Sequence, residues 1–330
     1  MHQSFVQLLA CPVCKGDLHL ESVSPAAQTI EEGNLLCDNG HAFPITRGIP
    51  RFVASDGYAA NFGFEWNLHN KTQLDTATER ESEETFQVKS GFEPRDVDGK
   101  LVLDVGCGMG RFTDVASRWG AMVVGIDLTS AVDAAYANVG ARENVHLAQA
   151  DIFALPFREE TFDVVFSLGV LHHTPDTRAA FDQLPRLVKP GGKIAIWVYG
   201  AGMRAWSWMS DIYRVATTRM PKRFLYALCH VAIPMYYVRK VRIVGQIAWR
   251  LFPMSVHPNR AWRVLDTFDW YSPTYQWKHS DAEVREWFES HGLVALRPLS
   301  FPTSLQGMRP EASGLSRGTV SEIPVGEVSR

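Results

Sequence analysis

Three glycines at alternate positions follow a short apolar run and an aspartate in LVLDVGCGMGRF, residues 101–112. Glycine permits the tight turn and the close backbone approach that a nucleotide-like ligand requires after a buried strand. Gly106, Gly108 and Gly110 form GxGxG, and Arg111 stands where the dinucleotide pattern GxGxxG requires a glycine. The triphosphate-binding pattern GxxxxGK[ST] is also absent from the sequence. The spacing therefore argues against a nicotinamide or flavin dinucleotide and against a nucleoside triphosphate.

Acidic residues stand where three strands of the same pattern would end. Asp127 ends an apolar run, where its carboxylate can accept hydrogen bonds from both hydroxyls of a ribose. Asp151 follows the next run, where an acid can bind an adenine amino group while the apolar Ile152 covers the ring. Asp104 ends the first run, near the expected position of a cationic amino-acid tail. These acids predict a site for adenosine that carries a positively charged amino acid.

Four metal-ligating residues lie close to the N-terminus in two pairs. Cys11 and Cys14 form CxxC, and Cys37 and His41 follow as CxxxH. Three thiolates and one imidazole are an accepted tetrahedral set for structural zinc, and they leave no open position for catalysis. We therefore predict one structural Zn²⁺. His19 is a competing fourth ligand, and buried thiols without a metal are the alternative interpretation.

The composition is that of an ordinary globular protein. The 330 residues are 46% hydrophobic and 21% charged, with a formal net charge of −3. This balance argues against a nucleic-acid-binding protein, which usually has a basic excess. No charged and then apolar leader precedes the first cysteine pair, so we expect a cytoplasmic protein. The longest uncharged stretch of the apolar middle, residues 224–238, is too short to span a bilayer.

Strand-like and helix-like segments alternate between residues 100 and 200. Such alternation predicts an α/β fold with a parallel, doubly wound sheet and a ligand at the carboxyl ends of the strands. The predicted strands occupy 101–105, 121–126, 144–150, 162–168 and 193–199, and the predicted helices occupy 111–119, 130–139 and 177–188.

Five runs occur between residues 100 and 200 in the order LDVGCGMGRF, GIDLT, QADIFALPF, FDVVFSLGVLHHTPD and LVKPGGKIAIWVYG. In this order they closely resemble the class I S-adenosylmethionine-dependent methyltransferases, and GVLHHTPD and LVKPGG resemble the branch that acts on small molecules. The resemblance implies a Rossmann-like sheet of seven strands, one of them antiparallel, and S-adenosyl-L-methionine as cofactor. It implies cofactor contacts from Asp104, Gly106, Cys107, Gly108, Asp127, Leu128, Asp151, Ile152, Ser167, Leu168 and Gly169.

Two histidines follow the fourth predicted strand, at the edge where the transferable methyl group should project. Methyl transfer is an in-line displacement, and an alcohol, phenol or acidic carbon acceptor can also need a base with a pKa near ambient pH. His172 and His173 are therefore candidate catalytic bases; capping of the next helix or covering of the adenine is the structural alternative. The loop DWYSPTYQWKH resembles a substrate-side loop of bacterial methyltransferases with an N-terminal zinc ribbon. It adds the candidates Tyr271, Tyr275 and His279.

Residues 200–265 carry eleven Lys and Arg against one acid, Asp211, and are rich in Trp, Tyr, Met and Phe. This segment could be a lid over a large hydrophobic or anionic molecule. It could also be a surface that contacts an anionic membrane, or an RNA-stacking surface. A plain helical subdomain with a solvated basic face would have the same composition.

We predict a methyltransferase that acts on an O or C atom of a hydrophobic small molecule or a lipid-linked intermediate, in the cytoplasm or peripheral to the inner face of the membrane. The alternatives are an rRNA or tRNA base methyltransferase and a non-catalytic cofactor-binding module. No nucleic-acid partner is favoured. No oligomeric state is predicted. The predicted regions are a zinc ribbon at 1–55, a helical lead-in over the cofactor site at 56–98, a core at 99–200, a basic and aromatic helical insertion at 201–265, the completion of the core at 266–305, and an edge strand with a flexible tail at 306–330.

Overall fold

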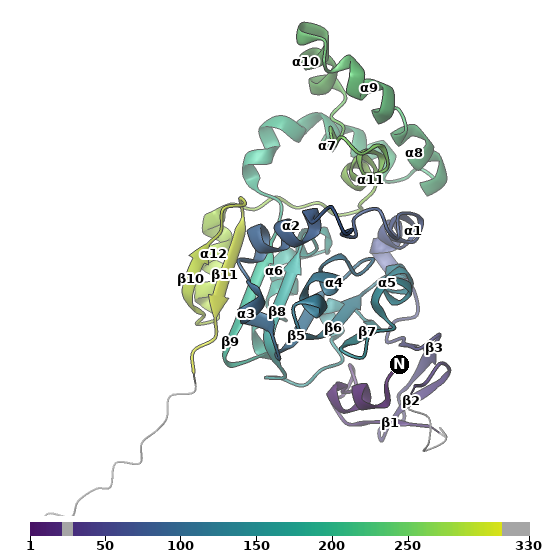
Figure 1. The fold of residues 1–330 in the computed structure, drawn as a ribbon, viewed down its shortest axis with the longest axis vertical. Helices are drawn as coiled ribbons and strands as arrows, with labels where there is room; N and C mark the ends of the chain where they lie inside the picture. Colours follow the sequence, from purple (N-terminus) through teal and green to yellow (C-terminus); the bar gives the residue numbers. More distant parts are fainter. Residues whose placement is uncertain (22–28, 312–330) are drawn as a thin grey trace, which may run out of the picture.

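The computed structural model describes residues 1–21 and 29–311, which form two β-sheets with helices around the larger one (Figure 1). The larger sheet has seven strands in the order β10-β11-β9-β8-β5-β6-β7. Among these, β11 alone runs against its neighbours. This doubly wound, Rossmann-like sheet with one reversed strand confirms the predicted fold class. The strands are β5 (Leu101–Val105), β6 (Met122–Asp127), β7 (Val145–Gln149), β8 (Phe162–Leu168), β9 (Val188–Trp197), β10 (Val294–Pro298) and β11 (Ser304–Met308).

The last strand of the chain lies inside the sheet. β11 pairs with β9 on one side and with β10 on the other, so β10 forms the edge. Leu305 of β11 is buried, and a side chain at Gly307 would collide with Phe288, whereas most of β10 is exposed. The prediction of an edge strand in this part of the chain is therefore wrong. The predicted tail beyond residue 311 lies outside the described residues.

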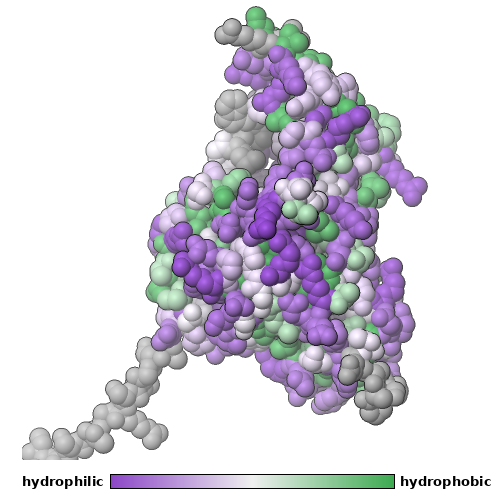
Figure 2. Space-filling view, viewed as in Figure 1, coloured by the Kyte–Doolittle hydropathy of each residue, from purple (hydrophilic) through white to green (hydrophobic). Residues whose placement is uncertain are grey.

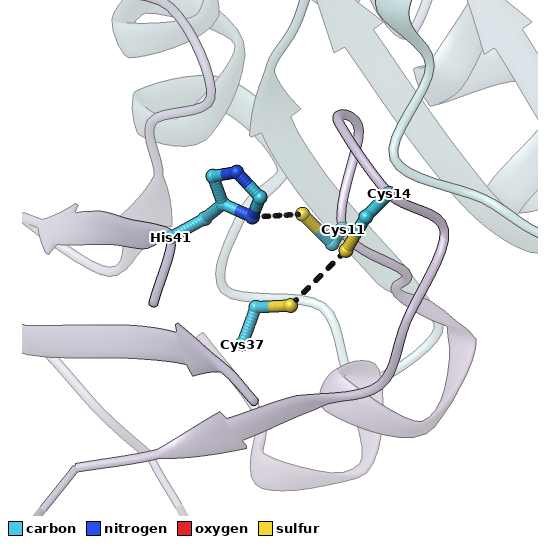
Figure 3. Close-up of side chains that lie close together, drawn as sticks. All are labelled: Cys11, Cys14, Cys37 and His41. Carbon is cyan, nitrogen blue, oxygen red and sulfur yellow. Dashed lines mark hydrogen bonds between the residues drawn. The ribbon is translucent and has the colours of Figure 1, made fainter. Parts of the chain in front are cut away.

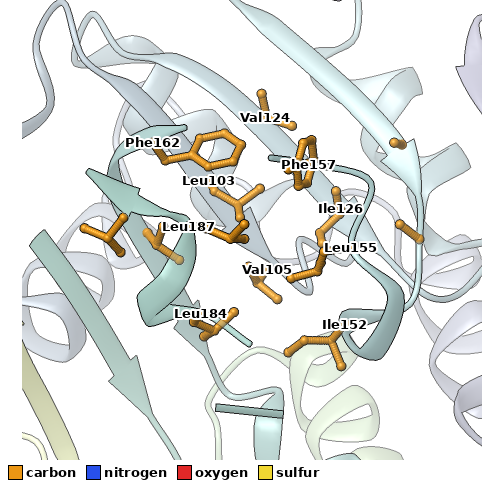
Figure 4. Packing of buried hydrophobic residues seen from close by; sticks show 14 of the residues in the cluster. Leu103, Val105, Val124, Ile126, Ile152, Leu155, Phe157, Phe162, Leu184 and Leu187 are labelled. Carbon is orange, nitrogen blue, oxygen red and sulfur yellow. The ribbon is translucent and has the colours of Figure 1, made fainter. Parts of the chain in front are cut away.

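Successive residues of each strand point to opposite faces of the large sheet. Val102 and Val123 pack on one face, and Leu103 and Val124 pack on the other, where they meet Phe157 (Figure 4). The first face is covered by α2 (Glu81–Ser90), α3 (Pro94–Val97), α4 (Arg111–Arg118) and α5 (Ala131–Val139). The second face is covered by α6 (Thr177–Phe181), α12 (Asp281–Ser290) and the N-terminal segment.

The helix predicted over 177–188 is shorter than expected. α6 ends at Phe181, and a 3₁₀ turn at Pro185–Leu187 leads into β9. Proline has no backbone donor and its ring collides with the preceding turn, so it does not continue a helix. β9 accordingly begins at Val188 rather than at residue 193.

The N-terminal ribbon is docked against the edge of the large sheet. Phe52 donates a backbone hydrogen bond to Gln149 of the edge strand β7 (2.8 Å), and Arg51 lies 2.6 Å from Asp133 of α5. Phe5 belongs to the same apolar core as the strands of the second face. The ribbon therefore covers a sheet edge that would otherwise be open to another chain. It consists of a 3₁₀ helix η1 (Gln3–Leu8) and the antiparallel strands β1 (Leu18–Leu20), β2 (Gly33–Cys37), β3 (Ala42–Thr46) and β4 (Ile49–Pro50).

A helical insertion leaves the core after β9 and stands above the carboxyl ends of the strands (Figure 1). Its small core contains Leu225, Val264 and Phe268, and Phe64 of α1 packs against it. The insertion and the lead-in helices therefore meet over the same end of the sheet. The helices are α1 (Ala60–Leu68) of the lead-in and α7 (Arg204–Thr217), α8 (Lys222–Cys229), α9 (Ala232–Val238), α10 (Arg242–Leu251) and α11 (Arg260–Tyr271) of the insertion.

Candidate active site

A cavity of about 620 Å³ lies at the carboxyl ends of β5, β6, β7 and β8. The glycine turn after β5 forms part of its wall. Gly106, Gly108 and Gly110 all have positive φ, at 81°, 54° and 86°, which favours glycine. A Cβ on Gly106 would also lie 2.4 Å from the side chain of Val170. The turn therefore brings backbone to the cavity at a place where a side chain would not fit.

Asp127 at the end of β6 faces this cavity. One carboxylate oxygen accepts from the Gly108 amide at 2.9 Å, and the other accepts from the amide and hydroxyl of Thr129 at 2.8 and 2.7 Å. Burial raises the pKa of Asp127, and these hydrogen bonds partly offset that rise because they favour the charged form. The arrangement holds a carboxylate rigidly at the cavity, where it can accept further hydrogen bonds.

Eight of the eleven predicted cofactor residues line the cavity. Three predicted residues do not. They are Asp104, Asp151 and Ser167. The lining residues of the predicted set are Gly106, Cys107, Gly108, Asp127, Leu128, Ile152, Leu168 and Gly169.

Asp104, Asp151 and Ser167 each bond to a neighbouring group of the protein. Asp104 is buried and accepts from the Thr113 hydroxyl at 2.7 Å, and burial raises its pKa to about 7. Asp151 accepts from the Phe153 amide at the start of a 3₁₀ turn, and the Ser167 hydroxyl donates to a backbone carbonyl of β5. Asp104 and Ser167 therefore bond within the core, whereas the partly exposed Asp151 caps the turn that carries the lining residue Ile152.

The two candidate histidines occupy different environments. His173 lines the cavity, and its Nδ1 donates to the backbone carbonyl of Tyr275 at 2.9 Å, so its Nε2 is left as an acceptor. Burial lowers the pKa of His173 to about 4. His172 is buried away from the cavity lining and stacks on Tyr199, with ring centroids 3.9 Å apart. Neither nitrogen of His172 has a hydrogen-bond partner in the described part of the chain, and burial lowers its pKa well below the usual range.

Tyr271 at the end of α11 and the loop that follows it lie outside the cavity lining. The Tyr271 hydroxyl donates to a carbonyl within the insertion at 2.7 Å, and the His279 ring packs against Trp287. Tyr275 contributes the carbonyl that binds His173. This loop therefore positions His173 through the carbonyl of Tyr275. The side chains of Tyr271 and His279 do not line the cavity.

Residues that we did not predict make up much of the remaining wall. α1, α2 and α11 supply carboxylates, a lysine and several tryptophans. For Asp266 and Asp269, the spacing of the two acids in DTFDW, among aromatic residues, was a signal that could have indicated them. The unpredicted lining residues include Glu65, Trp66, Lys89, Trp197, Trp262, Asp266, Asp269 and Trp270.

The candidate metal ligands converge in the ribbon. Their ligand atoms all lie within 4.8 Å of one another (Figure 3). Cys11 Sγ is 3.5 Å from His41 Nδ1, and Cys14 Sγ is 3.3 Å from Cys37 Sγ. Zn–S bonds of about 2.3 Å in a tetrahedron place sulfurs about 3.8 Å apart, so these residues fit a zinc ion. His19, the competing ligand, lies outside the cluster.

Two segments of the chain match family models of known proteins. Residues 103–196 match the family model of a methyltransferase domain, and residues 3–48 match that of Trm112p-like protein. The core is a class I methyltransferase domain. It belongs to the S-adenosylmethionine-dependent class, and the Trm112p-like region corresponds to the predicted zinc ribbon.

The methyltransferase domain is similar to parts of several other proteins. A ubiquinone biosynthesis O-methyltransferase of Hahella chejuensis is 32% identical over 157 residues, which are 47% of this chain and 57% of that protein. Phosphoethanolamine N-methyltransferase 2 of Caenorhabditis elegans is 34% identical over 110 residues, 32% of this chain and 25% of that protein. An O-methyltransferase family structure from Burkholderia thailandensis has a TM-score of 0.45 at 15% identity, covering 77% of this chain and 61% of that one. The chain thus spans 57% and 25% of the lengths of these two curated relatives, which is less than two thirds of either.

Proposed function

We propose that this protein transfers the methyl group of S-adenosylmethionine to an oxygen atom of a small molecule or lipid-linked intermediate held in the cavity. The observation that carries the proposal is the cavity itself, where the glycine turn of β5 and the Asp127 carboxylate of β6 meet at the carboxyl ends of the strands. The likeness of the methyltransferase domain to ubiquinone O-methyltransferases supports oxygen as the methylated atom.

The residues of the cavity fit S-adenosylmethionine by their chemistry. Asp127 would accept hydrogen bonds from the ribose hydroxyls, Ile152 would cover the adenine, and the turn at 106–108 would contact the amino-acid part. The sulfonium supplies an activated methyl group. Asp104 and Ser167 would act on this site indirectly, because Asp104 ties the end of β5 to Thr113 of α4 and Ser167 ties the end of β8 to that of β5.

The helices above the sheet would enclose the acceptor. α1, α2 and α11 all contribute side chains to the cavity, so they can exclude water and hold the acceptor beside the methyl group. Such positioning can supply much of the rate of an in-line displacement. The test is equilibrium binding of S-adenosylmethionine or its demethylated product to the full-length chain, and NADH binding without either would refute the proposal.

We further propose that α8, α9 and α10 contact an anionic membrane surface, which would give access to a lipid-linked acceptor. Large apolar side chains on these helices are exposed beside exposed cations, and apolar and polar residues alternate on this part of the surface (Figure 2). Apolar insertion with electrostatic attraction is how peripheral helices bind anionic lipid. In the described residues, no helix is both long and apolar enough to cross a bilayer. The exposed apolar residues are Phe224, Leu228, Val231, Tyr237, Val241, Ile243, Ile247 and Leu251, and the exposed cations include Arg223, Arg239, Lys240 and Arg250.

We assign one structural zinc ion to Cys11, Cys14, Cys37 and His41. The convergence of the four ligand atoms supports this assignment, and Asn39 donates to the Cys14 sulfur at 3.2 Å as an outer partner. With four protein ligands, the ion would stabilise the ribbon and take no part in methyl transfer.

A further inference from the structure

Glu65 of α1 is a buried carboxylate that faces the cavity without a partner. Its side chain has no exposed surface, yet it lines the cavity. Neither of its oxygens has a hydrogen-bond partner among residues 1–21 and 29–311. A buried polar group without a partner is costly, so the position indicates a group that arrives from the cavity. Burial, followed by the nearby charges of Asp269 and Asp266, raises the pKa of Glu65 well above its usual range.

Two further carboxylates from α11 line the same cavity. Asp266 and Asp269 lie three residues apart, so both lie on one face of the helix. Asp269 accepts from the Tyr199 hydroxyl at 3.0 Å, and Asp266 accepts from the Ser255 hydroxyl at 2.8 Å. Each therefore keeps oxygen lone pairs for another donor. Burial raises the pKa of both carboxyls to about 6.

Flat aromatic side chains accompany these carboxylates. Indole rings offer a large apolar surface on which another ring can stack. The ammonium of Lys89 already lies over one of them, 3.3 Å from the ring centre of Trp197. The tryptophans of the cavity wall are Trp66, Trp197, Trp262 and Trp270.

Acids outnumber bases in the cavity wall, so it disfavours an anionic acceptor. Lys89 and Arg111 are the Lys and Arg residues in the lining, and Arg111 already donates to Ser82, Gln73 and Thr85. Even without Glu65, whose raised pKa favours the neutral form, the other five acids outnumber Lys89 and Arg111, so an acceptor that carries a phosphate or carboxylate would meet net repulsion. The acids of the lining are Glu65, Glu81, Glu84, Asp127, Asp266 and Asp269.

From this geometry we infer that Glu65 and Asp269 bind the hydroxyl of an uncharged ring compound, and that Asp269 takes the proton of that hydroxyl during methyl transfer. The inference rests on the proposed function. The acceptor oxygen forms its bond to the methyl carbon as the carbon–sulfur bond breaks, and that electron pair stays on sulfur. The hydroxyl proton moves to a carboxylate oxygen of Asp269, which leaves a methyl ether, a neutral thioether and a protonated Asp269.

Asp269 is a better base than the histidine that the sequence indicated. Burial disfavours the charged form of both groups, but it raises the pKa of Asp269 to about 6 and lowers that of His173 to about 4. The group with the higher pKa accepts a proton more readily near neutral pH. The charged and titratable groups that face Asp269 are Tyr199 after β9, Arg214 of α7, Lys89 of α2, Glu65 of α1 and Asp266 of α11.

The first test measures binding to the full-length protein saturated with S-adenosylhomocysteine. The two probes are 4-methylcatechol, which is uncharged, and 3,4-dihydroxybenzoate, which has the same hydroxylated ring with a carboxylate. We expect 4-methylcatechol to bind at least about tenfold more tightly than the anion, and Glu65→Gln and Asp269→Asn each to weaken its binding about tenfold. Glu286→Gln on the exposed surface of α12 is the matched control and should change nothing.

The inference would be overturned if the anion bound as tightly as 4-methylcatechol or more tightly, or if neither probe bound. The proposed function would still stand in these cases, provided that S-adenosylhomocysteine binds. Failure to bind S-adenosylhomocysteine would overturn both.

The second test follows methyl transfer to 4-methylcatechol against pH. We expect turnover to fall below about pH 6 as Asp269 becomes protonated, and Asp269→Asn to reduce kcat about a hundredfold or more. Tyr199→Phe removes a donor that favours charged Asp269, so the low-pH limb of its profile should move to higher pH. A merely structural role of Asp269 would not produce that shift. An unshifted profile in Tyr199→Phe, full turnover in Asp269→Asn, or no transfer to this probe would contradict the assignment of the base.

Discussion

Asp104 and Asp127 end neighbouring strands, yet the fold gives the two carboxylates different surroundings. Asp127 faces the cavity from β6, whereas Asp104 is directed toward α4 and accepts from Thr113. Both were predicted as cofactor contacts because each follows an apolar run. The run identifies the strand end, but Asp104 pairs with Gly125, two residues before Asp127, so both carboxylates take the same face of the sheet and Asp104 lies deeper, farther from the carboxyl ends of the strands. The sequence therefore predicted the site and not the contact of each acid.

Burial of Asp104 predicts a pH dependence of stability. Its pKa is about 7 in the folded protein and near 3.8 when unfolded, so the folded state retains the proton over a range where the unfolded chain has lost it. The stability contributed by this group is therefore present below about pH 4 and falls as the pH rises to about 7. Compared with Asp104→Asn, the wild type should lose up to about 4 kcal/mol of unfolding free energy across this range.

Chemical denaturation of both proteins at pH 4, 5.5 and 7.5 measures this difference. If the unfolding free energies of the two proteins differed by the same amount at all three pH values, Asp104 would have an ordinary pKa in the folded protein.

For His173, the sequence predicted the position of the side chain and not its chemistry. The motif LHHTPD placed His173 at the cavity as predicted, but burial and the carbonyl of Tyr275 make it a weak base. Glu65 lies on α1, in the segment that the sequence assigned to the lead-in. Asp269 lies on α11 of the insertion, although the sequence assigned residues 266–305 to the completion of the core. Nothing in their local sequence shows that these helices meet, because long-range packing through Phe64 and Phe268 brings them together.

At the scale of elements, the strand–helix alternation predicted the core sheet well, because each buried strand is a short apolar run. The errors lie where tertiary pairing decides the outcome. β11 enters between β9 and β10, and no local pattern distinguishes an inner strand of a hairpin from an edge strand.

The ribbon should lose stability when its metal site is disrupted. Cys37→Ala removes one of four ligands, so we expect less than half an equivalent of zinc and a melting temperature several degrees lower. Because Phe5 and Leu9 belong to the core of the large sheet, loss of the metal should also destabilise that sheet. S-adenosylhomocysteine binding should persist. His19→Ala, which lies outside the cluster, is the control and should retain one zinc, as measured by metal analysis and calorimetry. Full zinc content in Cys37→Ala would contradict the ligand set.

The insertion should bind vesicles that contain anionic phospholipid. Ile243 and Ile247 are exposed and four residues apart on α10, so they lie on one face of that helix. Replacing both with serine should weaken binding to phosphatidylglycerol vesicles about tenfold or more, because each isoleucine contributes about 1 kcal/mol or more when it enters the interface. Val13→Ser, an exposed residue of the ribbon, is the control, and flotation of the full-length protein is the measurement.

The membrane proposal would be contradicted if the wild-type protein did not bind anionic vesicles in the flotation measurement. Binding to RNA with a steep salt dependence would instead favour the RNA alternative.

At the scale of the whole molecule, three segments far apart in sequence enclose one cavity. The core supplies the glycine turn and Asp127, the lead-in supplies α1 and α2, and the insertion supplies α11. The ribbon lies on the opposite side of β7, and its described residues, 1–21 and 29–55, contribute none of the cavity lining. Sequence reasoning predicted the cofactor half of this cavity because its residues follow consecutive strands. The acceptor half depends on how the insertion folds back onto the core, which composition alone does not determine.

The central claim is that the cavity beyond β5 and β6 binds S-adenosylmethionine. Isothermal titration of the full-length protein with S-adenosylhomocysteine tests it most directly. We predict one bound equivalent, and a loss of about 1–3 kcal/mol in Asp127→Ala, which is about fivefold to 150-fold in affinity. Asp17→Ala, a surface acid paired with Arg158, should bind as the wild type does. Binding of NADH with no binding of S-adenosylhomocysteine, or undiminished affinity in Asp127→Ala, would contradict the account.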